Sequence, residues 1–158
     1  MIGLQEAFDL LQETTAPVGE EKVPLDELSG RVAAEDLAAG RDVPDFSRAM
    51  MDGYAVRAAD VAGAAPGDPV TLRVTGRVMA GSDPGEGPGP GEAWEIGTGA
   101  PLPDEADGVV PYEWTRQPGP PAAPEDGPRP LEVRRPLGEG AKGVNVAPPG
   151  EDLEAGAP

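Results

Sequence analysis

Glycine and proline interrupt this chain so often that long regular elements are excluded. The 158 residues include 23 glycines and 21 prolines. Glycine weakens helices and strands because its backbone is too free, and proline does so because it has no amide proton. Turn signals recur about every ten residues after a helical N-terminus, as in a protein built from short strands. The sequence therefore predicts an α+β fold with a β-rich part.

Helical periodicity is confined to the N-terminus. Residues 4–15 carry apolar side chains at helical spacing, and Pro17 follows as a stop signal. A short helical segment is predicted over residues 26–32. Residues 33–39 are rich in alanine, which favours helix by propensity.

Alternating apolar and polar residues predict the strands. The first alternation, in residues 70–74, is interrupted at Gly76 and resumes at Val78. Pro111 indicates an edge strand or a bulge. Residues 57–65 are expected at the surface. Further strands are predicted at 94–96, 108–114 and 131–134, and mobile Pro/Gly-rich loops at 82–91 and 117–130.

Composition restricts the possible partners. The net charge of −17 argues against binding nucleic acid or an anionic membrane. The absence of Cys and His leaves carboxylate oxygens as metal ligands, which suit Mg²⁺. No signal sequence or run of 18 apolar residues is present, so a cytoplasmic location is expected. Aromatic residues make up only 4% of the chain, so Val, Leu, Ala and Met must supply most of the core.

The most distinctive motif is Pro-Asp-Phe-Ser-Arg-Ala-Met-Met-Asp-Gly-Tyr-Ala-Val, residues 44–56. Asp52-Gly53 is a turn dipeptide, because glycine accepts positive φ and aspartate can bond its own backbone. Flanking apolar residues would fix that turn on a core, so the carboxylate of Asp52 would project from a rigid backbone. A simple turn without a function is the alternative reading.

This motif resembles the N-terminal motif of the MoeA-type molybdopterin molybdotransferases, the family that includes the gephyrin E domain. Two further blocks match in the same order. Residues 94–113 resemble the Thr-Gly-Ala-Pro block and the strand after it, and Gly150-Glu151-Asp152 resembles a Gly-Glu-Asp motif. Residues 78–81 add a weaker match. The resemblance covers nearly the whole chain.

The resemblance implies an elongated module made of two parts. Residues 1–43 and 138–158 would form a split helical/β first domain, used for linking and dimerisation, and residues 44–137 an inserted β-rich domain. It also implies a strand at residues 33–39. Members of the family continue into a molybdopterin-binding α/β domain, so the sequence is expected to be the N-terminal part of a longer enzyme.

The implied reaction is the insertion of molybdenum from molybdate into adenylylated molybdopterin, by a homodimer that uses Mg²⁺. The resemblance implies Asp52 and Thr98 as catalytic residues and Asp52 as a metal ligand. Most of the Mg²⁺ ligands would come from the α/β domain. The alternative function is an inactive acidic dimerisation or binding module. The implied substrate-binding residues are Ser47, Arg48, Gly53, Gly99, Glu151 and Asp152.

Two departures from the family pattern concern charge. Many members carry Asp-Asn-Ser where this chain has Ser47-Arg48-Ala49, and an Arg-rich stretch where it has Ala147-Pro148-Pro149. The second change removes basic groups that would attract an oxyanion. Structural roles are the alternatives for several residues: a turn hydroxyl for Thr98, solvated carboxylates for Glu113, Glu151 and Asp152, and core or interface packing for Met50 and Met51.

Overall fold

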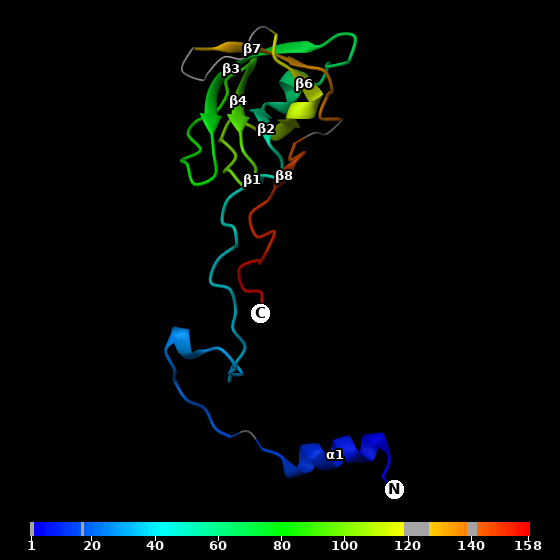
Figure 1. The fold of residues 1–158 in the computed structure, drawn as a ribbon, viewed down its shortest axis with the longest axis vertical. Helices are drawn as coiled ribbons and strands as arrows, with labels where there is room; N and C mark the ends of the chain where they lie inside the picture. Colours follow the sequence, from blue (N-terminus) through cyan, green and yellow to red (C-terminus); the bar gives the residue numbers. More distant parts are fainter. Residues whose placement is uncertain (1, 17, 119–126, 139–141) are drawn as a thin grey trace. The chain divides into compact units, whose positions relative to one another are not determined.

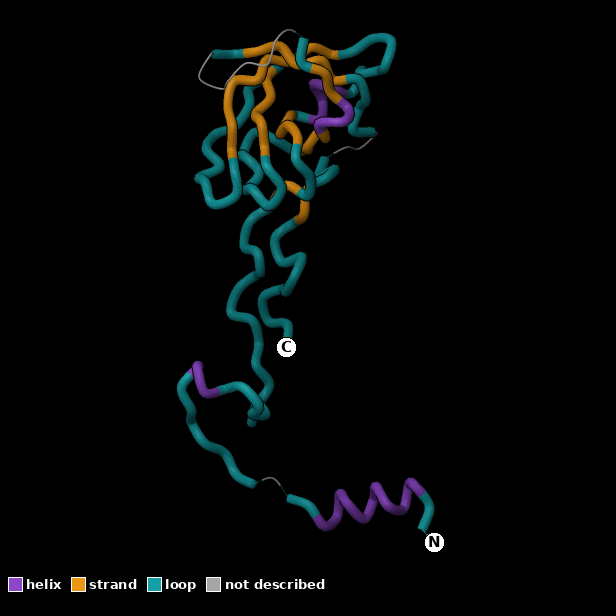
Figure 2. Tube along the Cα trace, in the orientation of Figure 1, coloured by secondary structure: helices purple, strands orange, loops and turns teal. Residues whose placement is uncertain are grey.

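The fold is given by a computed structural model that describes residues 2–16, 18–118, 127–138 and 142–158. The chain divides into two compact units, Met1–Leu37 and Ala38–Pro158. Figure 1 follows the chain through both units, and Figure 2 shows that the strands all belong to the second.

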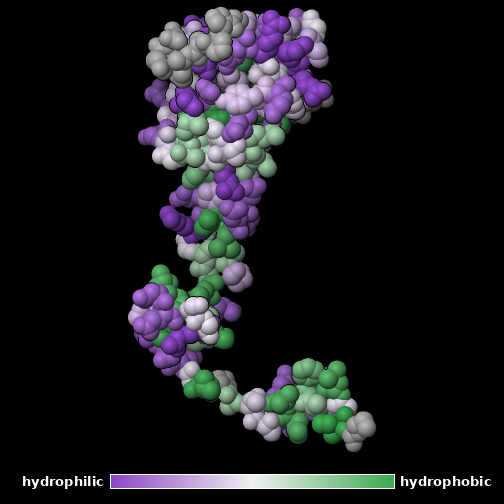
Figure 3. Space-filling model, viewed as in Figure 1, coloured by the Kyte–Doolittle hydropathy of each residue, from purple (hydrophilic) through white to green (hydrophobic). Residues whose placement is uncertain are grey.

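The first unit holds one α-helix and no buried side chain among its described residues. Helix α1, Leu4–Thr14, confirms the predicted helix, and its end is marked by the Thr15 amide donating to Leu11 O at 3.0 Å. The segment predicted as helical at 26–32 is reduced to a 3-10 turn, η1, Leu25–Glu27. Residues 33–39 form neither the helix nor the strand considered for them. Green hydrophobic side chains lie on the surface of α1 in Figure 3.

The second unit contains a six-stranded mixed sheet and a two-stranded sheet. The large sheet has the order β5-β2-β4-β3-β7-β6, and β1 pairs with β8. The predicted edge position of the strand with Pro111 is confirmed, although this strand ends at Pro111 and a 3-10 turn, η3 (Tyr112–Trp114), follows. The strands are β1 (Arg48–Ala49), β2 (Gly53–Val56), β3 (Val70–Val78), β4 (Glu92–Ile96), β5 (Gly108–Pro111), β6 (Thr115–Arg116), β7 (Arg129–Val133) and β8 (Val146–Ala147).

The alternation in the sequence breaks at Gly76, and the structure has an irregularity there although β3 itself continues to Val78. The register between β3 and its parallel neighbour β4 shifts between Val74 and Gly76. A Cβ atom at Gly76 would lie 2.5 Å from Cε2 of Trp94. The indole ring therefore occupies the space that any larger residue would need.

The core consists of Val, Leu, Ile, Ala and one Tyr side chain. Methionine does not contribute as expected, because Met50, Met51 and Met79 are exposed. The prediction that residues 57–65 lie at the surface is wrong in part. The 3-10 turn η2, Ala58–Val61, buries Ala58 and Val61 against the sheet, because its apolar residues face the cluster that contains Tyr54 and Leu72.

One of the two loop predictions is modified and the other is confirmed. Arg129 and Pro130 belong to β7, so the predicted loop at 117–130 is shorter than expected, and residues 119–126 lie outside the described residues. Residues 82–91 do form a loop, and its Gly91 amide donates to Asp60 Oδ2 at 2.9 Å. The mobility of both loops stays a prediction.

Residues 39–49 and 145–157 run antiparallel to each other within the second unit (Figure 1). Their backbones are hydrogen-bonded to each other along this stretch. At one end Gly156 N donates to Ala39 O at 2.8 Å, and at the other end β1 pairs with β8. The large sheet is built from the residues between these two segments. The domain boundaries stay a prediction. Nowhere in the described residues is a helix long and apolar enough to span a membrane.

Candidate functional site

Strand β1 brings the three sequence blocks together. On one edge, Gly99 N donates to Ala49 O at 2.8 Å and Leu102 N donates to Ser47 O at 2.9 Å. On the other edge, Arg48 and Ala49 pair with β8, which precedes Gly150-Glu151-Asp152. A strand of two residues thus joins the Thr98 loop to the Gly-Glu-Asp segment.

Asp52 and Thr98 form a direct pair. The amide and the hydroxyl of Thr98 both donate to Asp52 Oδ1, at 2.7 and 2.8 Å. Gly99 adopts a φ of +78° that suits glycine, and its amide returns the loop to β1 by donating to Ala49 O. The backbone and then the side-chain hydrogen bond from Thr98 lower the pKa of Asp52. Asp52 is therefore an exposed anion with one oxygen, Oδ2, left for another group.

The predicted Asp52-Gly53 turn is wrong, because Gly53 is the first residue of β2 and does not adopt a positive φ. Gly53 has a packing reason to be glycine instead. A Cβ atom at this position would lie 2.1 Å from Val110 O, because β2 runs close beside β5 there. Its contribution to the site is to let the chain enter β2 directly after Asp52. The expectation that Gly53 contacts substrate stays a prediction.

Arg48 lies against the Gly-Glu-Asp motif. Its Nη2 is 2.9 Å from Glu151 Oε2 and 3.2 Å from both oxygens of Asp152. The hydrogen bond to Glu151 is the main cause that raises the pKa of Arg48. The three side chains together carry one net negative charge. Four of the predicted substrate-binding residues, Ser47, Arg48, Glu151 and Asp152, are thus neighbours through β1.

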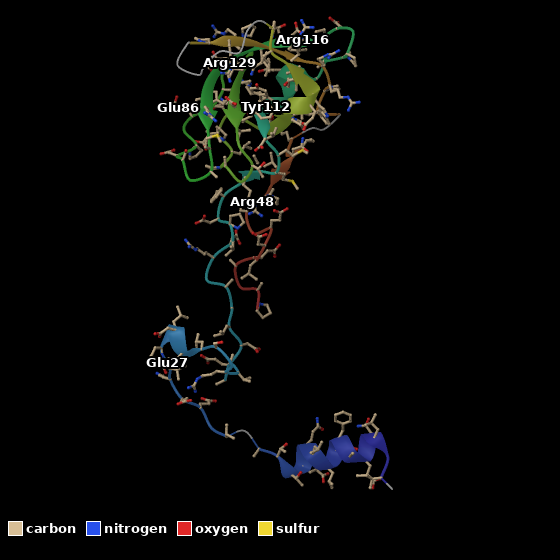
Figure 4. All side chains as sticks on the ribbon, viewed as in Figure 1. Glu27, Arg48, Glu86, Tyr112, Arg116 and Arg129 are labelled. Atoms are coloured by element: carbon tan, nitrogen blue, oxygen red, sulfur yellow. The ribbon has the colours of Figure 1, made fainter. Side chains whose placement is uncertain are left out.

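Tyr112 is a neighbour of Asp52 that the sequence did not identify. Its amide lies 3.4 Å from Asp52 O, and its hydroxyl donates to Glu95 Oε1 at 2.8 Å. Arg129 Nη2 donates to Glu95 Oε2 at 2.8 Å. Burial is the first cause that raises the pKa of Tyr112, and the bond to Glu95 is the second. Tyr112, Glu95 and Arg129 come from η3, β4 and β7, which are far apart in the sequence, so no local sequence signal could predict that they meet. Figure 4 labels Tyr112 and Arg129, together with Arg48.

Gly97 faces both the side chain of Met79 and the carboxylate of Asp52. A Cβ atom on Gly97 would be 3.0 Å from Met79 Cε and 4.0 Å from Asp52 Oδ1. Met79 and Met51 are both partly exposed. The Asp52–Thr98 pair therefore lies at a surface that is partly apolar.

The described residues do not supply a metal site by themselves. They contain no group of three or more Asp and Glu side chains placed to hold one ion. Asp52 has one free oxygen and could provide a single ligand. The assignment of Mg²⁺ to Asp52 therefore stays a prediction, and the rest of its coordination would have to come from other groups. A pocket lined by residues 74–77 and 127–129 contains none of the predicted site residues.

Known proteins resemble this chain over its whole length. The family model described as the MoeA N-terminal region (domain I and II) matches residues 2–158. The molybdopterin molybdenumtransferase of Synechococcus elongatus is 43% identical over 116 residues, which are 72% of this chain and 29% of the relative. Molybdopterin molybdenumtransferase 2 of Mycobacterium tuberculosis is 36% identical over 156 residues, 99% of this chain and 36% of the relative.

Solved structures agree. A molybdopterin biosynthesis MoeA protein from Pyrococcus horikoshii superposes with a TM-score of 0.74 at 37% identity, over 99% of this chain and 37% of that protein. The chain spans about a third of the length of these relatives. Sequence, fold and the convergence of the three motifs therefore agree that the chain belongs to the MoeA family, of which it spans the N-terminal region.

Proposed function

We propose that this chain is the N-terminal part of a molybdopterin molybdotransferase, which inserts molybdenum from molybdate into adenylylated molybdopterin. The names of its relatives support a role in molybdenum cofactor biosynthesis. The observation that carries the proposal is the meeting of Asp52–Thr98 and Glu151–Asp152 on the two edges of β1. Because the relatives are about three times as long, we assign the complete reaction to this region together with others.

In the proposed site, Asp52 is the carboxylate that orients a reacting partner. The Thr98 amide and hydroxyl fix one of its oxygens, so the other keeps one direction without further ordering. Gly99 leaves room for a ligand at the loop. Ser47 lines the adjacent edge at β1, together with Arg48 and its partner Glu151. Asp52 itself would repel molybdate, so cationic groups must accompany the oxyanion.

We also propose that the protein is cytoplasmic and forms a homodimer. The dimer is supported by helix α1, whose Leu4, Phe8 and Leu11 are 78%, 55% and 57% exposed and lie along one helical face. A second copy would cover that apolar face. Sedimentation should show a dimer at micromolar concentration, and a monomer at every concentration would contradict the proposal.

The test of the catalytic assignment is Asp52→Asn in a chimera. In it, this chain replaces the matching N-terminal region of the Mycobacterium tuberculosis relative. The amide keeps an acceptor for Thr98 and removes only the charge, so the fold should persist while molybdenum insertion falls by about 100-fold, as for the loss of an orienting group. Asp104→Asn, at an exposed aspartate of another loop, is the matched control and should leave insertion unchanged.

The alternative function, a dimerisation or binding module without catalysis, makes a different prediction. It has support in the fact that Arg48, Glu151 and Asp152 satisfy one another. Under it, Asp52→Asn leaves insertion within a factor of two of the parent chimera, or the parent chimera itself is inactive despite being folded. The first result removes Asp52 from the catalytic site, and the second favours a module without catalysis.

A further inference from the structure

We propose that Arg48 is a positioning residue that acts through Glu151 and Asp152, and that it does not receive the oxyanion substrate. In this role its guanidinium holds the Gly-Glu-Asp segment beside the Thr98 loop. The use of that geometry in catalysis rests on the proposed function. The geometry itself can be measured without any reaction.

The backbone of Arg48 is fixed from both sides. Residues 47–49 bond to the Thr98 loop on one edge, and Arg48 pairs with Ala147 on the other. Arg48 also forms a β-bridge with Pro101, three residues beyond Thr98. The guanidinium therefore starts from a position that is set relative to Thr98.

The backbone of the Gly-Glu-Asp segment bonds to residues 43 and 44. Gly150 N donates to Pro44 O at 2.8 Å and Asp152 N donates to Val43 O at 3.0 Å. Gly150 adopts a φ of +76°, and a Cβ atom there would lie 3.3 Å from Asp42 Oδ1. These bonds tie the main chain of the segment to residues that precede β1. Arg48 is the side chain that ties its two carboxylates to β1 itself.

The charges around Arg48 disfavour an oxyanion. Nη2 is shared between two carboxylates, and an incoming anion would have to displace at least one of them while facing the other. A guanidinium held by two carboxylates can orient them, since charge-assisted hydrogen bonds are short and directional.

Amide hydrogen exchange of this chain tests the holding role. Arg48→Gln should lower protection at the Asp152 and Leu153 amides by about fivefold, the effect of losing one partly exposed ion pair, while the sheet amide of Leu72 is unchanged. Arg48→Lys should restore part of the protection, because it keeps the charge. Arg73→Gln, which removes the exposed pair of Arg73 with Glu92, is the matched control and should not affect residues 152 and 153.

Two results would overturn the inference. Unchanged protection at Asp152 and Leu153 in Arg48→Gln would show that the segment needs no guanidinium. An equal loss at Leu72 would show general destabilisation instead of local positioning. Molybdate titration of the parent chain gives an independent answer: the side-chain NMR signals of Arg48 should not move, and a saturable shift would identify Arg48 as an oxyanion receptor. A failure of the chimera assay would refute the proposed function and leave these measurements unaffected.

Discussion

The two units of the chain differ in what covers their apolar side chains. In Ala38–Pro158, Leu72, Ile96, Leu131 and six valines of the sheet and its turns are almost completely buried. In Met1–Leu37, the described residues include a regular helix whose apolar face stays exposed. An isolated helix of 11 residues is marginal in water. The comparison shows that periodicity alone predicts an element, whereas a buried partner surface is what stabilises it.

The largest expected effect is the difference in stability when the same Leu→Ala substitution is made in each of the two units. Leu131→Ala in the core should lower the free energy of unfolding by about 2–5 kcal/mol, because it removes buried methyl groups and leaves a cavity. Leu11→Ala on α1 should change it by less than about 0.5 kcal/mol. Both tryptophans, Trp94 and Trp114, lie in the second unit, so urea unfolding followed by fluorescence reports on that unit.

A Leu11→Ala effect as large as that of Leu131→Ala would mean that α1 packs on the same core, and the comparison would fail. If the loss of stability in Leu11→Ala instead grows with protein concentration, a second copy of the chain covers α1.

The second prediction concerns the close approach of β2 and β5. Gly53→Ala should destabilise the second unit by about 1–3 kcal/mol, because its methyl group would overlap the Val110 carbonyl and force the strands apart. Gly67→Ala is the control, since a Cβ atom there meets nothing within 4 Å. Equal stability of the two variants in urea unfolding would contradict the strand geometry that supports Asp52.

The smallest effect concerns the Asp52–Thr98 pair. Thr98→Val removes the hydroxyl bond but keeps the amide bond and the shape, so the pKa of Asp52 should rise toward its ordinary value. Because the folded state lowers this pKa, the Asp52 carboxylate stabilises the fold above its unfolded pKa and loses that contribution as pH falls through the folded pKa. The Thr98→Val variant should therefore lose less of its folding stability than the parent chain as the pH falls through this range.

Carbon NMR of the Asp52 carboxylate during a pH titration measures the shift directly. Thr71→Val, at an exposed threonine of β3, is the matched control. An unchanged Asp52 pKa in Thr98→Val would show that the hydroxyl does not contribute and that Thr98 acts only through its backbone.

Local chemistry in the sequence determined the helix at residues 4–14, the strands that alternate in polarity and the irregularity at Gly76. Each depends on residues near one another in the chain, through helical spacing, alternation or backbone freedom. The motifs also indicated the family, which the comparisons confirm. Where the prediction used average composition instead, as for methionine in the core, it was wrong.

Only the tertiary structure decided which of these residues meet. Asp52 and Thr98 are joined because β2 pairs with β4, which places the two strand ends side by side. Arg48 reaches Glu151 because β1 pairs with β8, across about a hundred residues of chain. The apolar residues of 58–64 are buried because the sheet covers them. Such contacts depend on strand order and register, which are fixed by the packing of the whole sheet and leave no local signal in the sequence.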